Sequence, residues 1–297
     1  MAATGADEVR DDRLLAPTFW TAVVIVPVLA AAFVILYIFS THTKALWAWT
    51  IAVPMSAKVM GAGYVSGATF FFRTAYRRRW HRVAVGFLSI TAFTTLLLLA
   101  TILHWDKFNH DHVSFYAWLL LYLITPPLLP LLWHNNQRTD PGTPDDLDTI
   151  MPMRLRRLVT VGGALQTTFA ALLFIRPSLF ADRWPWPVTP LTARCVAAYV
   201  IFPGIAWMWF SREARWSCFR VTMQTITFAL CLIGIGALTT RDSFAGRPAS
   251  SVWGFAIALA TMIGLLVWLQ VAMDRRRTAS PSYFDLKIPP GAGWGSS

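Results

Sequence analysis

The feature that most constrains this chain is a series of eight apolar stretches, each long enough to cross a lipid bilayer. A membrane-spanning helix needs about 20 predominantly apolar residues. Only 14% of the 297 residues are charged and 56% are hydrophobic, so lipid is the expected solvent for most side chains. We therefore predict an all-α, multi-pass integral membrane protein. The stretches lie near residues 17–39, 52–72, 83–104, 114–133, 156–175, 190–210, 219–239 and 252–273.

The basic residues predict the orientation of these helices. The net charge is +11, and the 26 Lys and Arg residues lie mainly in short segments between apolar stretches rather than on one soluble face, so a nucleic-acid partner is not expected. Cytoplasmic loops of membrane proteins carry an excess of Lys and Arg. The termini and the loops after the second, fourth and sixth stretches hold 18 of the 26. We therefore predict the cell (cytoplasmic) membrane as the location, with both termini in the cytoplasm.

The chain also matches itself when it is shifted by 136 positions. Pro54–Phe108 then aligns without gaps to Pro190–Phe244, with 11 identities in 55 positions, including Trp80 with Trp216. Four spans per unit is an even number, so both copies would have the same orientation in the membrane. Parallel repeats of this kind occur in transporters. The alternative is that tryptophan and proline recur at helix ends because the membrane interface favours them.

The duplication predicts the domain organisation. It comprises a cytoplasmic N-terminal segment, 1–16, a first four-helix repeat, 17–133, a cytoplasmic linker, 134–155, a second four-helix repeat, 156–273, and a disordered cytoplasmic tail, 274–297. The fold class is thus eight transmembrane helices as a tandem 4+4 parallel repeat.

Three segments carry a resemblance to known proteins. WAWTIAVPMSAKVMGAGY, ATILHWDKFNHDHVSFYAW and RWPWPVTPLTAR resemble an uncharacterised family of polytopic bacterial integral membrane proteins, and the likeness runs over most of the chain. The resemblance implies a bacterial cytoplasmic membrane. It implies no activity and lends no catalytic residues.

The first candidate site is a cation and a carboxylate that recur in both repeats. Lys58 with Asp106, and Arg194 with Asp242, are predicted near the outer membrane surface. Partly desolvated charges are costly unless they are paired. Each pair is interpreted as a structural ion pair or, alternatively, as a recess for an anionic group such as a carboxylate or lipid phosphate. Lipid-facing side chains that reach the interface are a third interpretation.

The second candidate is a histidine cluster in the string HWDKFNHDH. His104, His110 and His112 could hold a metal ion, although their spacing is not a recognised ligand pattern. Solvated loop histidines are the alternative. No cofactor is predicted.

The third candidate is a set of helix irregularities in and beside the predicted spans. Corresponding Gly or Pro breaks in two halves can mark a transporter's substrate path, whereas close helix packing through small residues is the alternative. The residues are Gly63 and Gly67 in the second span and Pro203 and Gly204 in the sixth. Gln224, an amide within the seventh span, is added as a candidate for a polar substrate path, with interhelical hydrogen bonding as the alternative.

These patterns favour a non-enzymatic function. The sequence has no HExxH or GxSxG motif and no phosphate-cradling glycine loop. The leading hypothesis is transport or binding of a small or lipidic, and potentially anionic, substrate between the two repeats, with membrane lipid as a partner. The alternatives are a structural or assembly subunit of a membrane complex and, third, a metal- or haem-dependent membrane enzyme. The oligomeric state is left open.

Overall fold

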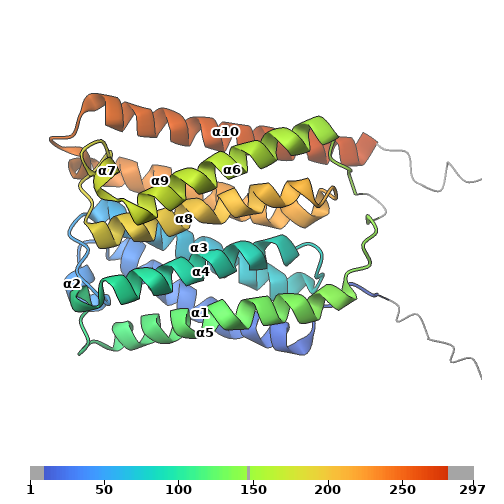
Figure 1. Cartoon of the computed structure of the whole chain (residues 1–297), viewed down its shortest axis with the longest axis horizontal. Coiled ribbons are helices and arrows are strands. Elements are labelled where there is room, and N and C mark those ends of the chain that lie inside the picture. The colour runs from blue at the N-terminus through green and yellow to red at the C-terminus, as the bar shows by residue number, and fades with distance from the viewer. Residues whose placement is uncertain (1–9, 146–147, 280–297) are drawn as a thin grey trace, which may run out of the picture.

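The computed structural model describes residues 10–145 and 148–279, and these residues form an elongated helical bundle (Figure 1). Eight helices have 18 residues or more, and short helical turns lie between several of them. The described residues contain no β-strand. They contain two isolated backbone bridges, one between Arg13 and Arg79 and one between Ile150 and Arg215. The long helices are α1 (Ala16–Phe33), α3 (Pro54–Arg77), α4 (Ala84–Leu103), α5 (Val113–Asn136), α6 (Met153–Ile175), α8 (Pro190–Met208), α9 (Ser217–Thr239) and α10 (Ala249–Ala279).

Seven of these helices are long and apolar enough to cross a membrane, as expected of a multi-pass membrane protein. The predicted second span, α3, is the long helix outside that group. Thirteen of its 24 residues are buried, and they include serine, threonine and glycine. A helix that faces protein on most of its surface does not need the apolar surface that lipid requires. The expectation of eight apolar spans is therefore met by seven, and the remaining helix packs inside the bundle.

The long helices form two layers of four. In one layer the order of neighbours is α5, α4, α8 and α6, and in the other it is α1, α3, α9 and α10. Figure 1 shows the first layer in front of the second. Contacts between α3 and α8 and between α4 and α9 join the layers at the centre. Each layer thus combines two helices from the first half of the chain with two from the second.

Prolines and glycines shape the ends and crossings of the central helices. Pro54 and Pro190 occupy the first turn of α3 and α8, where the missing N–H costs no intrahelical hydrogen bond. After α1 the chain continues as a π-helical turn, η1 (Val34–Ile38). Gly61 of α3 crosses that turn so closely that an added Cβ would lie 2.8 Å from the Cβ of Tyr37. The absence of a side chain at Gly61 therefore permits the close contact between α3 and η1.

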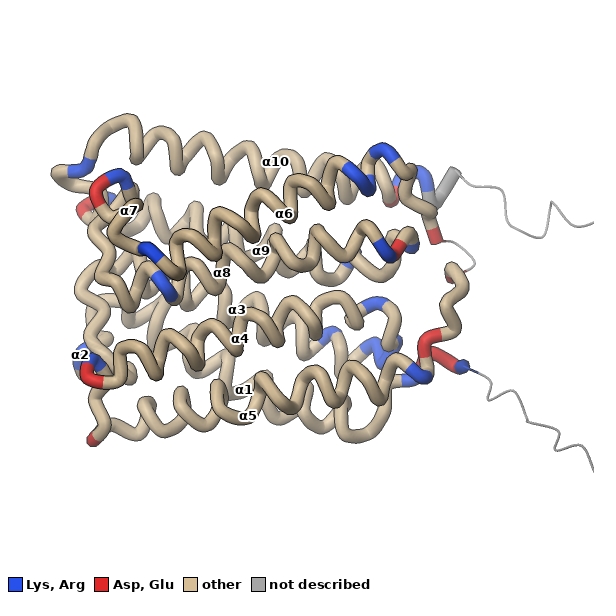
Figure 2. Tube along the Cα trace, viewed as in Figure 1, with Lys and Arg blue, Asp and Glu red and all other residues tan. Residues whose placement is uncertain are grey.

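The charged residues gather at the two ends of the bundle, and both ends of the described chain lie at the same one of these ends (Figure 2). Two tryptophan side chains are buried at that end. The indole of Trp80 donates to Gln137 (3.3 Å), and that of Trp216 donates to Asp274 (3.0 Å). Asp274 lies within α10, so the predicted disordered tail begins too early: residues 274–279 are helical. Residues 280–297 lie outside the described part of the chain.

Candidate functional site

A cavity of about 160 Å³ lies between the two layers. Six helices line it: α1, α3, α4 and α5 from the first half of the chain, and α8 and α9 from the second. The lining is overwhelmingly apolar, with Phe70, Phe71 and Phe93 among its aromatic rings. A space of this kind accepts apolar groups, because a polar molecule would lose its hydration without compensating hydrogen bonds.

Three tyrosines form the polar part of the cavity wall. The hydroxyls of Tyr64 and Tyr122 are hydrogen-bonded to each other at 2.7 Å, and the ring of Tyr199 contacts the rings of Tyr64 and Phe93. They come from α3, α5 and α8, so this cluster joins the two halves of the chain. The hydroxyls of Tyr64 and Tyr122 satisfy one another, which leaves their rings as the surface that a ligand would meet.

Two hydroxyls in the wall, those of Ser66 and Tyr199, have no hydrogen-bond partner among the described residues. The Oγ atom of Ser66 on α3 is buried and makes no hydrogen bond with any described residue. By contrast, the hydroxyls of Thr125 and Thr225 donate to carbonyl oxygens of their own helices. Ser66 and Tyr199 therefore offer two points at which a bound molecule could place a hydrogen-bonding group.

Three of the predicted helix-break residues line this cavity. Gly63 leaves room for the ring of Tyr199, since an added Cβ would lie 2.0 Å from its Cε1 atom. Gly67 and Pro203 also form part of the wall. However, α3 and α8 run through these positions without interruption. The prediction of broken helices is therefore wrong, because the backbone stays helical while the small side chains create space beside it.

The other two residues of that set lie elsewhere. Gly204 packs against α6, where an added Cβ would lie 2.5 Å from the Oγ1 atom of Thr167. That contact fits the alternative interpretation, close packing through small residues. Gln224 is half-buried on α9 and does not line the cavity.

The predicted ion pairs of Lys58 with Asp106 and of Arg194 with Asp242 do not form among the described residues. Lys58 donates to the carbonyl oxygen of Tyr37 (3.2 Å) and lies 4.6 Å from the centre of that tyrosine ring. The carboxylate of Asp106 binds the adjacent Lys107 at 2.6 Å. A neighbour in the same 3-10 turn is reached at lower entropic cost than a side chain on another helix.

Arg194 contacts His104 rather than Asp242. Its guanidinium lies 2.6 Å from the Nε2 atom of His104, at the end of α4, while Asp242 is exposed. Burial, together with the charge of Arg194, lowers the pKa of His104. A neutral imidazole can accept a hydrogen bond from Arg194, so this contact is favourable in the unprotonated state of the histidine.

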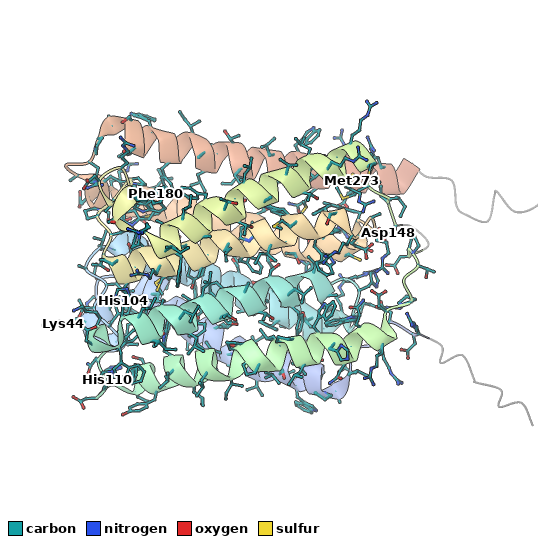
Figure 3. All side chains as sticks on the ribbon, viewed as in Figure 1. Lys44, His104, His110, Asp148, Phe180 and Met273 are labelled. Atoms are coloured by element: carbon teal, nitrogen blue, oxygen red, sulfur yellow. The ribbon has the colours of Figure 1, made fainter. Side chains whose placement is uncertain are left out.

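The three histidines proposed as metal ligands have separate surroundings. Figure 3 shows His104 and His110 at the end of the bundle away from the termini. His110 packs against the rings of Trp105 and Phe115, and His112 contacts Ser114 and the carbonyl oxygen of Ala45. Within residues 10–145 and 148–279, no group of three or more His, Cys, Asp or Glu side chains could hold a metal ion. The metal prediction is therefore not supported.

Sequence reasoning missed the tyrosine cluster and Ser66. Their positions in apolar stretches are visible in the sequence, but their convergence depends on how α3, α5 and α8 pack across the two layers. Searches for related proteins add no further residue: no family model, curated protein or solved structure matches the chain. The site must therefore be interpreted from its own geometry.

Proposed function

We propose that this protein binds a lipidic molecule within the membrane and holds its apolar part in the cavity between the two layers. The observation that carries the proposal is the cavity itself, which is lined by six helices and walled by aromatic and aliphatic side chains. Transport is the form of this function that a duplicated architecture favours. Ser66 supplies one position for a polar group of the ligand.

We also propose that the bundle is a tandem duplication, with residues 17–133 and 156–273 as its two four-helix units. Corresponding helices have corresponding neighbours, which supports this. α1 packs on α3 as α6 packs on α8, and α4 packs on α5 as α9 packs on α10. Between the units, α4 lies on α8 as α9 lies on α3. Such exchanged contacts are expected of two like-oriented units related by a rotation.

Hydrogen bonds at the end of the bundle that holds the termini support the same relationship. Asp12 accepts from the backbone N–H of His81 (2.8 Å) and contacts its ring, while Asp148 accepts from the backbone N–H and the hydroxyl of Ser217. Both pairs are related by the 136-position shift. The basic residues near these pairs favour a cytoplasmic location for this end of the bundle and for both termini, in a cell membrane.

One observation favours the alternative of an assembly subunit. Within its membrane-spanning window only 11% of α10 is buried, and Trp253 and Trp268 are more than half exposed. Lipid or a second protein could cover this face. Association through α10 would be compatible with a ligand in the cavity, so we retain it as the second candidate.

Lipid retention tests the leading proposal. The full chain would be purified gently and analysed by native mass spectrometry, which should show a retained lipidic molecule of defined mass. Ala229→Phe, in the cavity wall on α9, should fill the space and remove that mass. Ala258→Phe, on the exposed face of α10, is the matched control and should retain it. Retention of the same mass by the Ala229→Phe variant would overturn the proposal.

A further inference from the structure

A second hollow, of about 70 Å³, lies at the end of the bundle that holds the termini, between the last turns of α3 and the first turn of α9. The arginines that line it are Arg73, Arg77, Arg79, Arg82 and Arg220. The carboxylates of Asp145 and Asp148 also line it. Two further carboxylates lie within ion-pair distance of lining arginines, Asp12 beside Arg79 and Asp274 beside Arg220.

The two lining carboxylates are already engaged. Asp148 accepts hydrogen bonds from Ser217, and Asp145 accepts one from the Nη2 atom of Arg82. Arg220 directs its Nη2 atom to Asp274 at 2.9 Å. The Nε atoms of Arg82 and Arg220 remain buried without a hydrogen-bond acceptor among the described residues. Buried donors of this kind are costly unless a further acceptor meets them.

Arg73 and Arg77 have no carboxylate partner in the described part of the chain. Arg73 is half-buried on α3, and it experiences electrostatic repulsion from Arg220 and Arg77. The positive end of the α9 helix dipole lies beside the same hollow. Positive-inside topology alone requires basic residues at this end of the protein. It does not require that Arg73 and Arg77 converge on Arg220 without a carboxylate partner of their own among the described residues.

We propose that this recess binds a phosphate group, with Arg73 and Arg77 as its principal ligands and Arg82 and Arg220 contributing through their Nε atoms. Guanidinium groups match phosphate oxygens with paired hydrogen bonds, and the anion would offset the positive charges of Arg73 and Arg77. The hollow admits a small oxyanion rather than a chain. The phosphate could belong to a soluble ester or to a lipid headgroup, since Phe70 of the apolar cavity lies only one helical turn before Arg73.

Thermal unfolding of the full-length protein in a neutral detergent would test the recess. Inorganic phosphate would be compared with chloride at equal ionic strength, and short-chain phosphatidic acid with phosphatidylcholine. We expect phosphate, phosphatidic acid or both to raise the Tm of the unchanged protein. Arg73→Gln should weaken the apparent affinity at least tenfold. Arg157→Gln, an exposed arginine on α6 at the same end, should leave it unchanged.

Without any phosphate compound, Arg73→Gln should unfold at the same temperature as the unchanged protein or higher, because it relieves repulsion. Loss of the response in this variant would then not reflect misfolding. A response to inorganic phosphate indicates a soluble ester, and a response to phosphatidic acid alone indicates a lipid headgroup. No response to either compound, or equal loss in Arg73→Gln and Arg157→Gln, would overturn the inference.

The test of phosphate binding is independent of the test of lipid binding in the apolar cavity. Ala229→Phe fills the apolar cavity but does not touch the recess, so it should retain the response to inorganic phosphate even when it loses the lipidic molecule. A phosphate response without any lipid in the cavity would leave the recess established and the proposed function rejected.

Discussion

Arg215 and Asp140 form a bidentate ion pair that ties the segment after α5 to the loop before α9. The Nη1 and Nη2 atoms of Arg215 donate to the two carboxylate oxygens of Asp140 at 2.8 and 2.9 Å, and both residues are 5% exposed. Glu213 accepts from the same guanidinium. The pair therefore joins the end of the first half of the chain to the centre of the second.

Removing the Asp140 carboxylate should destabilise the protein strongly. Breaking a buried ion pair on one side costs about 3 kcal/mol, because the remaining charge keeps its desolvation penalty. We expect Asp140→Asn to lower the Tm in detergent clearly, whereas Asp182→Asn, at an exposed position, should leave it unchanged. Equal Tm values for the two variants would show that Arg215 is adequately balanced by Glu213 alone.

The same network predicts a loss of stability in acid. Burial would raise the pKa of Asp140 and of Glu213, but hydrogen bonds from Arg215 and nearby backbone amides outweigh it, so both pKa values lie below their ordinary 3.8 and 4.5. A carboxyl group with a depressed folded-state pKa stabilises the protein above its unfolded-state pKa and loses that contribution as pH falls through the folded value.

Thermal unfolding measured from pH 7 to pH 3 would check this prediction. The Tm of the unchanged protein should fall below about pH 4.5, where these groups begin to take up protons in the unfolded state. Asp140→Asn should show a shallower fall, since one of the titrating groups is gone. Parallel curves for the two proteins would exclude Asp140 as a source of the acid sensitivity.

The helices were predictable from sequence because lipid exposure requires long apolar stretches, and that requirement leaves a direct mark on composition. The partners of the polar residues were not predictable in the same way. Lys58 donates to the carbonyl oxygen of Tyr37, which lies in a π-helical turn. No residue pattern in the sequence predicts that turn. The recurrence of Asp106 in the second half predicts a distant cation as its partner, whereas in the structure its carboxylate binds the adjacent Lys107.

The cavity was only partly foreseeable. Gly63, Gly67 and Pro203 stand out in the sequence as irregular positions in apolar helices, and all three line the cavity. Its tyrosines did not stand out, since a single tyrosine in an apolar stretch has no characteristic spacing. Their side chains come together only through the packing of two layers, which is a long-range property of the fold.

Gly63 provides a direct test of the packing between α3 and α8. An alanine there would place Cβ 2.0 Å from Cε1 of Tyr199, so the ring or the helix must move. Overpacking of this kind costs about 1–3 kcal/mol. Gly162→Ala is the control, because no atom lies within 4 Å of an added Cβ there and alanine favours the helix. We expect a lower Tm for Gly63→Ala and an equal or higher one for Gly162→Ala.

The final prediction concerns the two aspartates that precede the two halves of the bundle. Asp12 accepts a backbone N–H and a ring contact from His81, in the loop before α4. Asp148 accepts the backbone N–H and the hydroxyl of Ser217, the first residue of α9. If the halves are copies, Asp12→Ala and Asp148→Ala should destabilise the protein in the same direction, by about 1–3 kcal/mol each, through loss of acceptors for buried donors. Asp111→Ala, at an exposed loop position, should be neutral in the same Tm measurement.

The serine at position 217 makes this comparison more specific. Ser217→Ala removes only the hydroxyl contact with Asp148 and leaves the backbone N–H contact, so it should cost less than Asp148→Ala. In the first half, His81→Ser should retain the backbone N–H contact to Asp12 and should likewise cost less than Asp12→Ala. A small effect of one aspartate and a large effect of the other would indicate that the two contacts arose separately, because duplicated halves that kept the same hydrogen bonds should depend on them alike.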